Sequence, residues 1–141
     1  AVIGSGMTGL ETSELLCAQG NKVTIVEMAD AIAPGAYFQH VDDAIPKLKA
    51  ADTTFLTSSK LVKINPNGIE IENTKSGATS SIAVDFVVLS MGCRPDTSLY
   101  DELINTKDRD YKVYKIGDCV KVGRIANATE SAYQLAIKLN R

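Results

Sequence analysis

Three glycines near the start of the chain have the spacing of a loop that binds a dinucleotide. They stand in the motif GSGMTG, between a short apolar run and a helical pattern that continues to Gln19. In such a loop the first glycine permits a tight turn, the second leaves room for a pyrophosphate, and the third allows close packing of helix and strand. Free N–H groups at the helix N-terminus then face the phosphates. The candidate cofactor-binding residues of this loop are Gly4, Ser5, Gly6, Met7, Thr8 and Gly9.

An acidic residue at the end of the next apolar run completes the pattern. The run KVTIVE ends at Glu27, near the spacing of ~20 residues that dinucleotide-binding folds use. Its two carboxylate oxygens can accept hydrogen bonds from the ribose diol of adenosine, whereas a 2′-phosphate would meet a like charge. Met28, and no arginine, follows, so the pattern favours NADH over NADPH. The alternative interpretation is that Glu27 is a solvated acid at the end of a strand.

Glu11 and His40 are two further residues whose side chains could take part in binding or catalysis. Glu11 lies two residues after the last glycine, where we expect the first turn of the helix. The helix dipole favours a carboxylate there, and this structural role and a place beside a nicotinamide both stay open. His40 is the only histidine, and no serine or cysteine nucleophile adjoins it in sequence. We therefore expect His40 on the surface, find a hydrolase a poor fit, and assign no catalytic residue.

Composition and charge exclude several classes of protein. Fifteen basic and 17 acidic residues give a net charge of −2, and no basic cluster is present that would bind nucleic acid. The three cysteines stand far apart with neither CxxC nor histidine spacing, so we predict no metal site. No apolar stretch approaches the ~18 residues of a membrane span, and no signal peptide opens the chain. We expect a cytoplasmic protein without membrane or nucleic-acid partners.

The elements that must position these residues follow from the pattern of apolar residues and turns. Strand, helix and strand open the chain, and the buried character of the strands predicts a parallel sheet. A helix shortened or kinked by Pro46 and another strand come next. Three further runs then predict an antiparallel meander that ends in a buried strand. The expected elements are strands at 1–4, 22–27 and 53–56, a helix at 38–50, and meander runs at 60–64, 68–73 and 82–92. This predicts an α/β fold with a Rossmann-like parallel sheet and a β-meander.

The composition shifts after the segment MGCRP at 91–95. A polar helix near 97–103, a charged loop, a strand at 113–118 and a closing helix are expected there. One face of the closing helix is apolar, with Ile125, Ala128, Ala132, Leu135, Ala136 and Leu139 on it. The first residues lie inside a predicted strand, so we interpret the chain as a fragment of a larger protein. Its expected parts are an NAD(P)H-binding domain at 1–93 and a C-terminal segment at 94–141.

Four motifs in this order carry a resemblance to a known family. GSGMTGLE is similar to the second glycine motif of flavoprotein reductases with two dinucleotide-binding domains, and IVE to the acid-bearing strand that follows it. LSMGCRP is similar to their crossover segment and KIGD to their flavin motif. The chain most resembles the C-terminal region of NADH:flavin oxidoreductases of the enoate reductase and 2,4-dienoyl-CoA reductase group. The resemblance covers essentially the whole chain.

The resemblance implies a cofactor role for several residues. NADH would lie with its pyrophosphate on the three loop glycines and its adenosine ribose on Glu27, with Glu11 toward the nicotinamide and Leu61 beside the adenine. FAD would meet Gly117 and Asp118, the latter facing the ribitol. Hydride would then pass from NADH to FAD. A hinge between the two cofactor segments is expected at Gly92, because glycine tolerates backbone angles that other residues resist.

For the full-length parent, the resemblance also implies an FMN, an iron-sulfur cluster, a catalytic barrel and the remainder of an FAD domain. The family's first glycine motif, which binds the ADP half of FAD, does not occur in this sequence, so the flavin site is only partly present. The CxxC of disulfide-reducing relatives is also missing, so we expect no dithiol exchange. Self-association into a homo-oligomer stays open.

Two other functions compete with an NADH-binding domain. In the first, GSGMTG is itself an FAD motif and, with the KIGD segment, forms a small FAD-binding protein. Such proteins usually have a glycine doublet after the acid-bearing strand, and here MADAIAPGAY follows instead. In the second, the chain is a non-catalytic nucleotide-binding or interaction module.

Overall fold

The computed structural model describes residues 1–140 and divides into two compact units. Unit 1 comprises residues 1–92 and unit 2 comprises residues 93–141. Arg141, the last residue of the predicted C-terminal segment, lies outside the described residues. The division falls one residue before the expected boundary after residue 93, and the cofactor role of each part stays a prediction.

Unit 1 is built on a four-stranded parallel sheet, as predicted. Its strand order is β3-β2-β1-β7, so the chain leaves β1 toward one edge of the sheet and returns on the other side of β1. In open sheets of this kind, ligands bind at the carboxyl ends of the strands where the strand order reverses. That point lies here at the carboxyl ends of the neighbouring strands β1 and β7. The strands span Val2–Ile3 (β1), Thr24–Val26 (β2), Thr54–Leu56 (β3) and Val88–Leu89 (β7).

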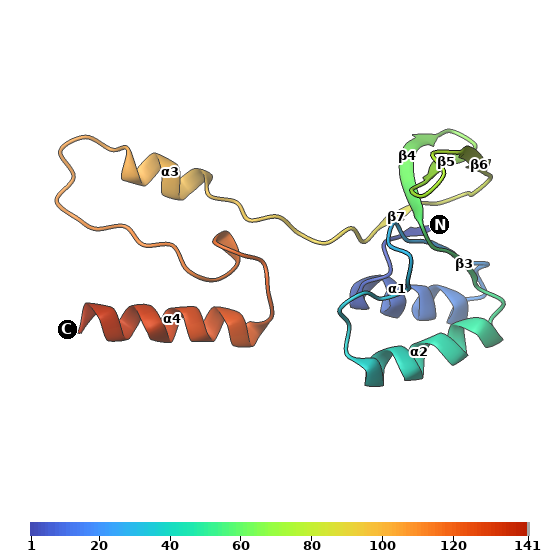
Figure 1. The fold of residues 1–141 in the computed structure, drawn as a ribbon, viewed down its shortest axis with the longest axis horizontal. Helices are drawn as coiled ribbons and strands as arrows, with labels where there is room; N and C mark the ends of the chain where they lie inside the picture. The colour runs from blue at the N-terminus through green and yellow to red at the C-terminus, as the bar shows by residue number, and fades with distance from the viewer. Residues whose placement is uncertain (141) are drawn as a thin grey trace. The chain divides into compact units, whose positions relative to one another are not determined.

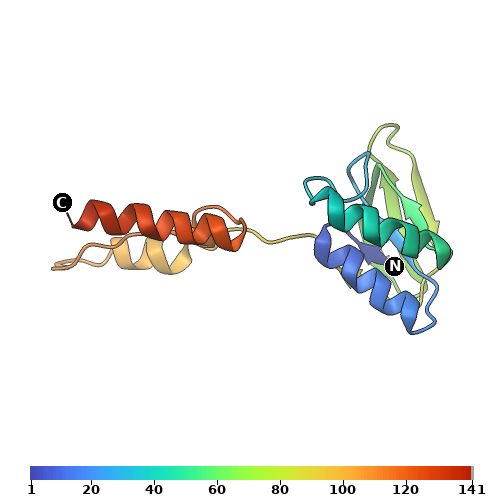
Figure 2. The ribbon, with the colours of Figure 1, turned by 90° about the horizontal axis from the view of Figure 1, so that it is seen from below.

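Neighbouring residues of a strand point to opposite faces of a sheet. The strands of this sheet carry apolar residues at both kinds of position, and each face is covered by another layer. Helices α1 (Met7–Ala18) and α2 (Phe38–Ala50) lie side by side on one face (Figure 1, Figure 2). The core beneath the helices comprises Val2, Leu10, Val23, Ile25, Ala33, Ala44 and Leu48. On the other face the core comprises Ile3, Val26, Ile69 and Ile71. The sheet is therefore the middle of three layers.

The third layer is the antiparallel meander β4 (Ser59–Asn65), β5 (Gly68–Asn73) and β6 (Thr79–Ile82). Its first two strands match the predicted runs, but the third was predicted too late in the chain. Of the run at 82–92, Ile82 ends β6 and Val88–Leu89 form β7, whose Leu89 is 55% exposed. The prediction of a final buried strand was wrong because β7 is an edge strand that pairs only with β1.

Helix α2 spans the predicted residues and is not shortened by Pro46. A proline inside a helix removes the N–H that would bond to the carbonyl four residues earlier, here that of Asp42. Asp42 is exposed, so water can satisfy its carbonyl, while Ala44 and Leu48 on the buried side of the helix fill the core. The packed face maintains the helix through the proline.

Unit 2 contains helix α3 (Ser98–Ile104), the 3₁₀ turn η1 (Gly117–Cys119) and helix α4 (Ile125–Leu139). The strand expected at 113–118 is absent from the described part of this unit. Residues 113–116 have no neighbouring strand to pair with, and an isolated strand gains no ladder hydrogen bonds. No described residue of unit 2 is fully buried. The apolar face predicted for α4 is largely uncovered, with Ile125 87% exposed.

Candidate dinucleotide-binding site

The glycine loop follows β1 directly and lies against Ser90, the residue after β7. Gly4 has a φ of +97°, and a methyl group on it would overlap the backbone carbonyl of Ser90. A methyl group on Gly9 would overlap the carbonyl of Gly4 in the same way. Around Gly6 nothing lies within 4 Å of the place a methyl would take. Two of the glycines are thus required by packing, and the middle one leaves open space beside the backbone.

Helix α1 begins at this open space. Gly6 is its N-cap and provides no side-chain hydrogen bond to the first turn. The first N–H groups of a helix have no partner inside the helix and attract anions. Met7 is half-buried, and Thr8 is exposed. The loop geometry therefore fits the phosphates of a dinucleotide.

Glu27 follows β2 and is buried, with 6% of its surface exposed. The backbone N–H and the hydroxyl of Ser5 both donate to its Oε2, at 2.8 and 2.7 Å. The N–H of Ala29 donates to Oε1 at 2.9 Å. The interpretation of Glu27 as a solvated acid is therefore wrong. Its side chain is part of the structure that connects the glycine loop to β2.

The charge of Glu27 is maintained by these hydrogen bonds. Burial raises the pKa of its carboxyl group, but the donors at Ala29, Ser5 and the backbone of Met28 outweigh this effect and hold the pKa below its ordinary value. The group is thus ionised at neutral pH. An ionised carboxylate is a pure acceptor with room for about four hydrogen bonds, and Ser5 and Ala29 donate three of them, so room for one more acceptor contact is left at Glu27.

The glycine loop and Glu27 line one cavity of about 300 Å³. This volume is at the lower end for small-molecule pockets. Six predicted cofactor-binding residues are brought together here: Gly4, Gly6, Glu27, Met28, Leu61 and Gly92. The predictions missed Ile3 and Val26 of the two central strands, and also Ser59, Lys60, Ser90 and Met91, which line the cavity as well. The only sequence signal for the last four is that they adjoin predicted residues at the start of β4 and the end of β7.

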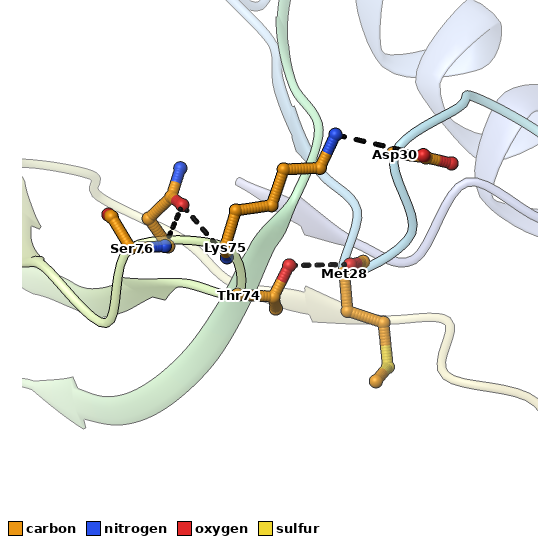
Figure 3. Close-up of polar contacts among 6 residues, drawn as sticks. Met28, Asp30, Thr74, Lys75 and Ser76 are labelled. Carbon is orange, nitrogen blue, oxygen red and sulfur yellow. Dashed lines mark hydrogen bonds and ion pairs between the residues drawn. The ribbon is translucent and has the colours of Figure 1, made fainter.

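The segment after Glu27 is held by the turn that follows β5. Figure 3 shows Thr74 pointing at Met28, whose carbonyl accepts a hydrogen bond from the Thr74 hydroxyl at 3.3 Å. Lys75 reaches Asp30, with 3.7 Å between Nζ and Oδ2. The side chain of Asn73 accepts from the backbone N–H groups of Lys75 and Ser76 and shapes the turn. These contacts connect Met28, which lines the cavity, to the turn after β5.

Glu11 does not line this cavity. We expected it in the first turn of the helix, but α1 begins at Met7 and has no acidic residue in its first turn. Glu11 lies one turn further along and is exposed. The helix starts earlier than expected because Gly6 already acts as N-cap. The expected dipole effect of the first turn is thus absent, and a contact with the nicotinamide end stays a prediction.

The predicted flavin residues lie in unit 2. Gly117 has a φ of +65° and donates its N–H to the hydroxyl of Ser131 at 2.9 Å. Asp118 is exposed, and its Oδ1 accepts from the N–H of Gly123 at 3.2 Å. A groove of about 710 Å³ lies between residues 114–123 and α4 and includes Gly117. The exposed carboxylate can meet a ribitol, but unit 2 supplies no glycine loop, so the fit to FAD is partial.

Other side chains add no further centre among residues 1–140. In that range no three His, Cys, Asp or Glu residues are grouped as metal ligands would be. Cys17, Cys93 and Cys119 are free thiols, and the Sγ of Cys17 lies 3.3 Å from the Thr53 hydroxyl. No helix in the described part of the chain has the length and apolarity to cross a bilayer.

Residues 1–134 match the family model described as "Pyridine nucleotide-disulphide oxidoreductase". The chain is 33% identical over 136 residues to the bilirubin reductase of Mediterraneibacter gnavus. It is 34% identical over 139 residues to the cinnamate reductase of Clostridium sporogenes and 33% identical over 135 residues to the NADH oxidase of Thermoanaerobacter brockii. Each alignment covers 96% of the chain but 20% of the relative. The chain thus spans about a fifth of the length of these relatives.

Solved structures give the same picture. A 2-naphthoyl-CoA reductase matches with a TM-score of 0.75 and 26% identity, over 97% of this chain and 20% of that one. A histamine dehydrogenase from Rhizobium matches with a TM-score of 0.78 over 99% of this chain and 23% of that one. Its identity is 19%, so this second likeness concerns the fold alone.

Proposed function

We propose that this chain, which belongs to the pyridine nucleotide-disulphide oxidoreductase family, is the NADH-binding domain of a flavin-dependent oxidoreductase. Members of this redox flavoprotein family use NAD(P)H and FAD. The observation that carries the proposal is that the glycine loop and the buried, ionised Glu27 line one cavity at the switch point of the sheet. In this proposal the chain orients NADH so that hydride passes to FAD. One relative is named NADH oxidase, which supports the choice of cofactor.

NADH rather than NADPH is the proposed ligand because of the charge around the adenosine end. Glu27 accepts from a ribose diol and repels a 2′-phosphate, and Met28 offers no positive charge. Lys60 is the cation among the residues that line the cavity, and it is the group that would weaken this preference. We therefore expect Lys60→Ala to strengthen the discrimination against NADPH.

FAD is proposed as a cofactor shared with the remainder of the full-length parent. The chain supplies Gly117 and Asp118, and the ADP half of FAD would bind outside it. A long cofactor that loses half of its contacts loses most of its binding free energy. We expect the purified chain to hold little or no FAD. For the parent we also propose a catalytic barrel that carries FMN and an iron-sulfur cluster, and a cytoplasmic location.

Calorimetry on the full chain tests the nucleotide. NADH should bind more tightly than NADPH, and Glu27→Ala should narrow the difference, because both the diol acceptor and the repulsion are lost. Glu102→Ala, which changes an exposed acid of unit 2, is the control and should leave both affinities unchanged. Equal or reversed affinities in the wild-type chain would contradict the proposal.

The parent tests the reaction. Hydride transfer needs the nicotinamide C4 within about 3 to 3.5 Å of the flavin N5, a geometry that an assembled pair of domains holds. NADH should bleach the flavin of the parent, and the isolated chain should show no turnover. A yellow isolated chain with stoichiometric flavin would instead favour the small FAD-binding protein. A parent that binds NADH without reducing its flavin would favour the nucleotide-binding module.

A further inference from the structure

One buried serine connects the glycine loop to the acid at the end of β2. Ser5 is fully buried, and its hydroxyl donates to Oε2 of Glu27 at 2.7 Å while it accepts from the N–H of Ala33 at 2.8 Å. The backbone N–H of Ser5 donates to the same Oε2 at 2.8 Å. Three separate segments, the loop after β1, the end of β2 and the stretch before α2, therefore meet at this side chain.

These contacts leave the two carboxylate oxygens of Glu27 unequal. Oε2 has two donors from Ser5, and Oε1 has the N–H of Ala29. An oxygen with two short donors has no lone pair left for a ligand, whereas Oε1 can accept further bonds. Because Glu27 lines the cavity, Oε1 is the acceptor that a ribose hydroxyl would meet.

The backbone at this position does not explain the serine. Ser5 has no positive φ, so an alanine would fit the loop conformation. A glutamate held by backbone donors alone would also retain freedom about its side-chain torsions. The hydroxyl adds a charge-assisted bond, which is stronger and more directional than a neutral one. Its distinct contribution is thus the orientation of the carboxylate.

We propose that Ser5 is a positioning residue for ribose recognition: its hydroxyl fixes the Glu27 carboxylate so that Oε2 faces the protein and Oε1 faces the ribose diol. This inference rests on the proposed function, since it assumes an adenosine ribose at Glu27. It deepens that function in two ways. The contact with the diol is assigned to Oε1 of Glu27, and the orientation of the carboxylate is assigned to Ser5, which does not itself touch the ligand. Ser5 would then influence the affinity for the ribose diol and leave the contacts of the phosphates unchanged.

The test compares two nucleotides that differ only in the diol, ADP and 2′,3′-dideoxy-ADP, on the full chain by calorimetry. In the wild type ADP should bind more tightly. Ser5→Ala should weaken ADP by about tenfold, the order expected for a misaligned hydrogen bond to a charged group. The affinity for dideoxy-ADP should stay within about twofold, so the ratio of the two affinities should fall toward one. Ser5→Thr, which keeps the hydroxyl, should restore the ratio.

A matched control separates positioning from general destabilisation. Ser13 is also fully buried, and its hydroxyl donates to the carbonyl of Gly9 at 2.7 Å, away from Glu27. Ser13→Ala removes the same atom and should leave the ratio unchanged. If Ser5→Ala does not fold, Ser5→Cys, which keeps a weak donor of similar size, is judged by the same ratio and should lower it.

Each outcome separates this inference from the proposed function. Equal losses for ADP and dideoxy-ADP in the Ser5 variant, or an unchanged ratio, would overturn the positioning role while NADH binding stands. A wild-type chain that binds neither NADH nor ADP would overturn the proposed function and this inference together. A ratio near one in the wild type, with NADH bound, would mean that Glu27 does not meet the diol.

Discussion

The two units of the chain use their apolar residues in opposite ways. Among residues 1–140, every buried hydrophobic residue lies in unit 1, where one cluster packs on each face of the parallel sheet. Helix α4 of unit 2 is similar in length to α1 and α2 of unit 1, but its Tyr133 and Leu139 are 62% and 56% exposed. A segment of this size rarely builds a core alone. Unit 1 thus has the internal support that a precise binding site needs, whereas unit 2 has an apolar surface that the proposed FAD domain of the parent would cover.

The largest expected effect comes from removing one buried leucine. Leu48 of α2 is 0% exposed and belongs to the core between the helices and the sheet, so Leu48→Ala should lower the free energy of unfolding of unit 1 by about 4 kcal/mol through the cavity it leaves. Leu135 of α4 is only half-buried, and Leu135→Ala should cost less than about 1 kcal/mol. Denaturant melts of the two variants measure this. Equal losses of unfolding free energy in the two variants would mean that unit 2 also has a core of its own.

The second effect concerns the loop that unit 1 supports. Gly4→Ala would force a methyl group onto the carbonyl of Ser90 at a φ of +97°, and we expect a loss of about 3 kcal/mol from overlap and strain together. Gly20 also has a positive φ, +84°, but open space around it. Gly20→Ala should therefore cost only about 1 kcal/mol. Urea denaturation would show whether the site depends on close packing or on turn geometry alone.

Local patterns predicted what local forces determine. The helix predicted at 38–50 has the bounds of α2, and its buried residues Ala44 and Leu48 lie four positions apart on one face. The parallel sheet followed from apolar, β-branched runs alternating with helices. The prediction of a strand at 113–118 was wrong because a strand is stable only when it pairs with a neighbouring strand, and the described part of unit 2 contains no such neighbour. Pairing is a property of the whole fold and not of the segment.

The site shows the same limit at the scale of single atoms. Spacing was enough to name Gly4, Gly6 and Glu27 as neighbours, since the glycine motif fixes its own geometry. The hydrogen bond between Ser5 and Glu27 joins residues 22 positions apart, and no local sequence pattern predicts it. Lys60 reaches the cavity only because the meander folds back over the sheet. Such contacts depend on the packing of the layers.

A smaller effect is expected at Gly92, where the two units join. Gly92 has a φ of +77°, a conformation that valine resists and asparagine tolerates. In the parent, Gly92→Val should slow flavin reduction by about tenfold, more than it weakens NADH binding, if the joint must flex during the reaction. Gly92→Asn should have little effect. Stopped-flow flavin bleaching beside NADH affinity measures both. An unchanged reduction rate in a folded protein would mean that Gly92 is only a turn residue.

The smallest expected effect is the response of each unit to acid. The pKa of Glu27 in unit 1 lies below its ordinary value of 4.5 despite the opposing effect of burial, because of its hydrogen bonds from Ala29 and Ser5. The pKa of Asp96 in unit 2 is lowered by the backbone N–H and hydroxyl of Ser98, on an exposed loop. A lowered folded-state pKa stabilises the fold above the ordinary value and loses this contribution as the pH falls through the folded value.

Unit 1 should therefore lose the Glu27 contribution as the pH falls below 4.5, because the unfolded state then binds the proton more readily than the folded state. In Glu27→Gln this part of the pH dependence should vanish, so wild type and variant should differ less in unfolding free energy at low pH than at neutral pH. Asp96→Asn should change the acid response little, because solvent screens an exposed carboxylate. Unfolding curves across this pH range decide it. An equal response to both variants would mean that the Glu27 network adds no more than a surface hydrogen bond, and that the two units differ in burial but not in electrostatic support.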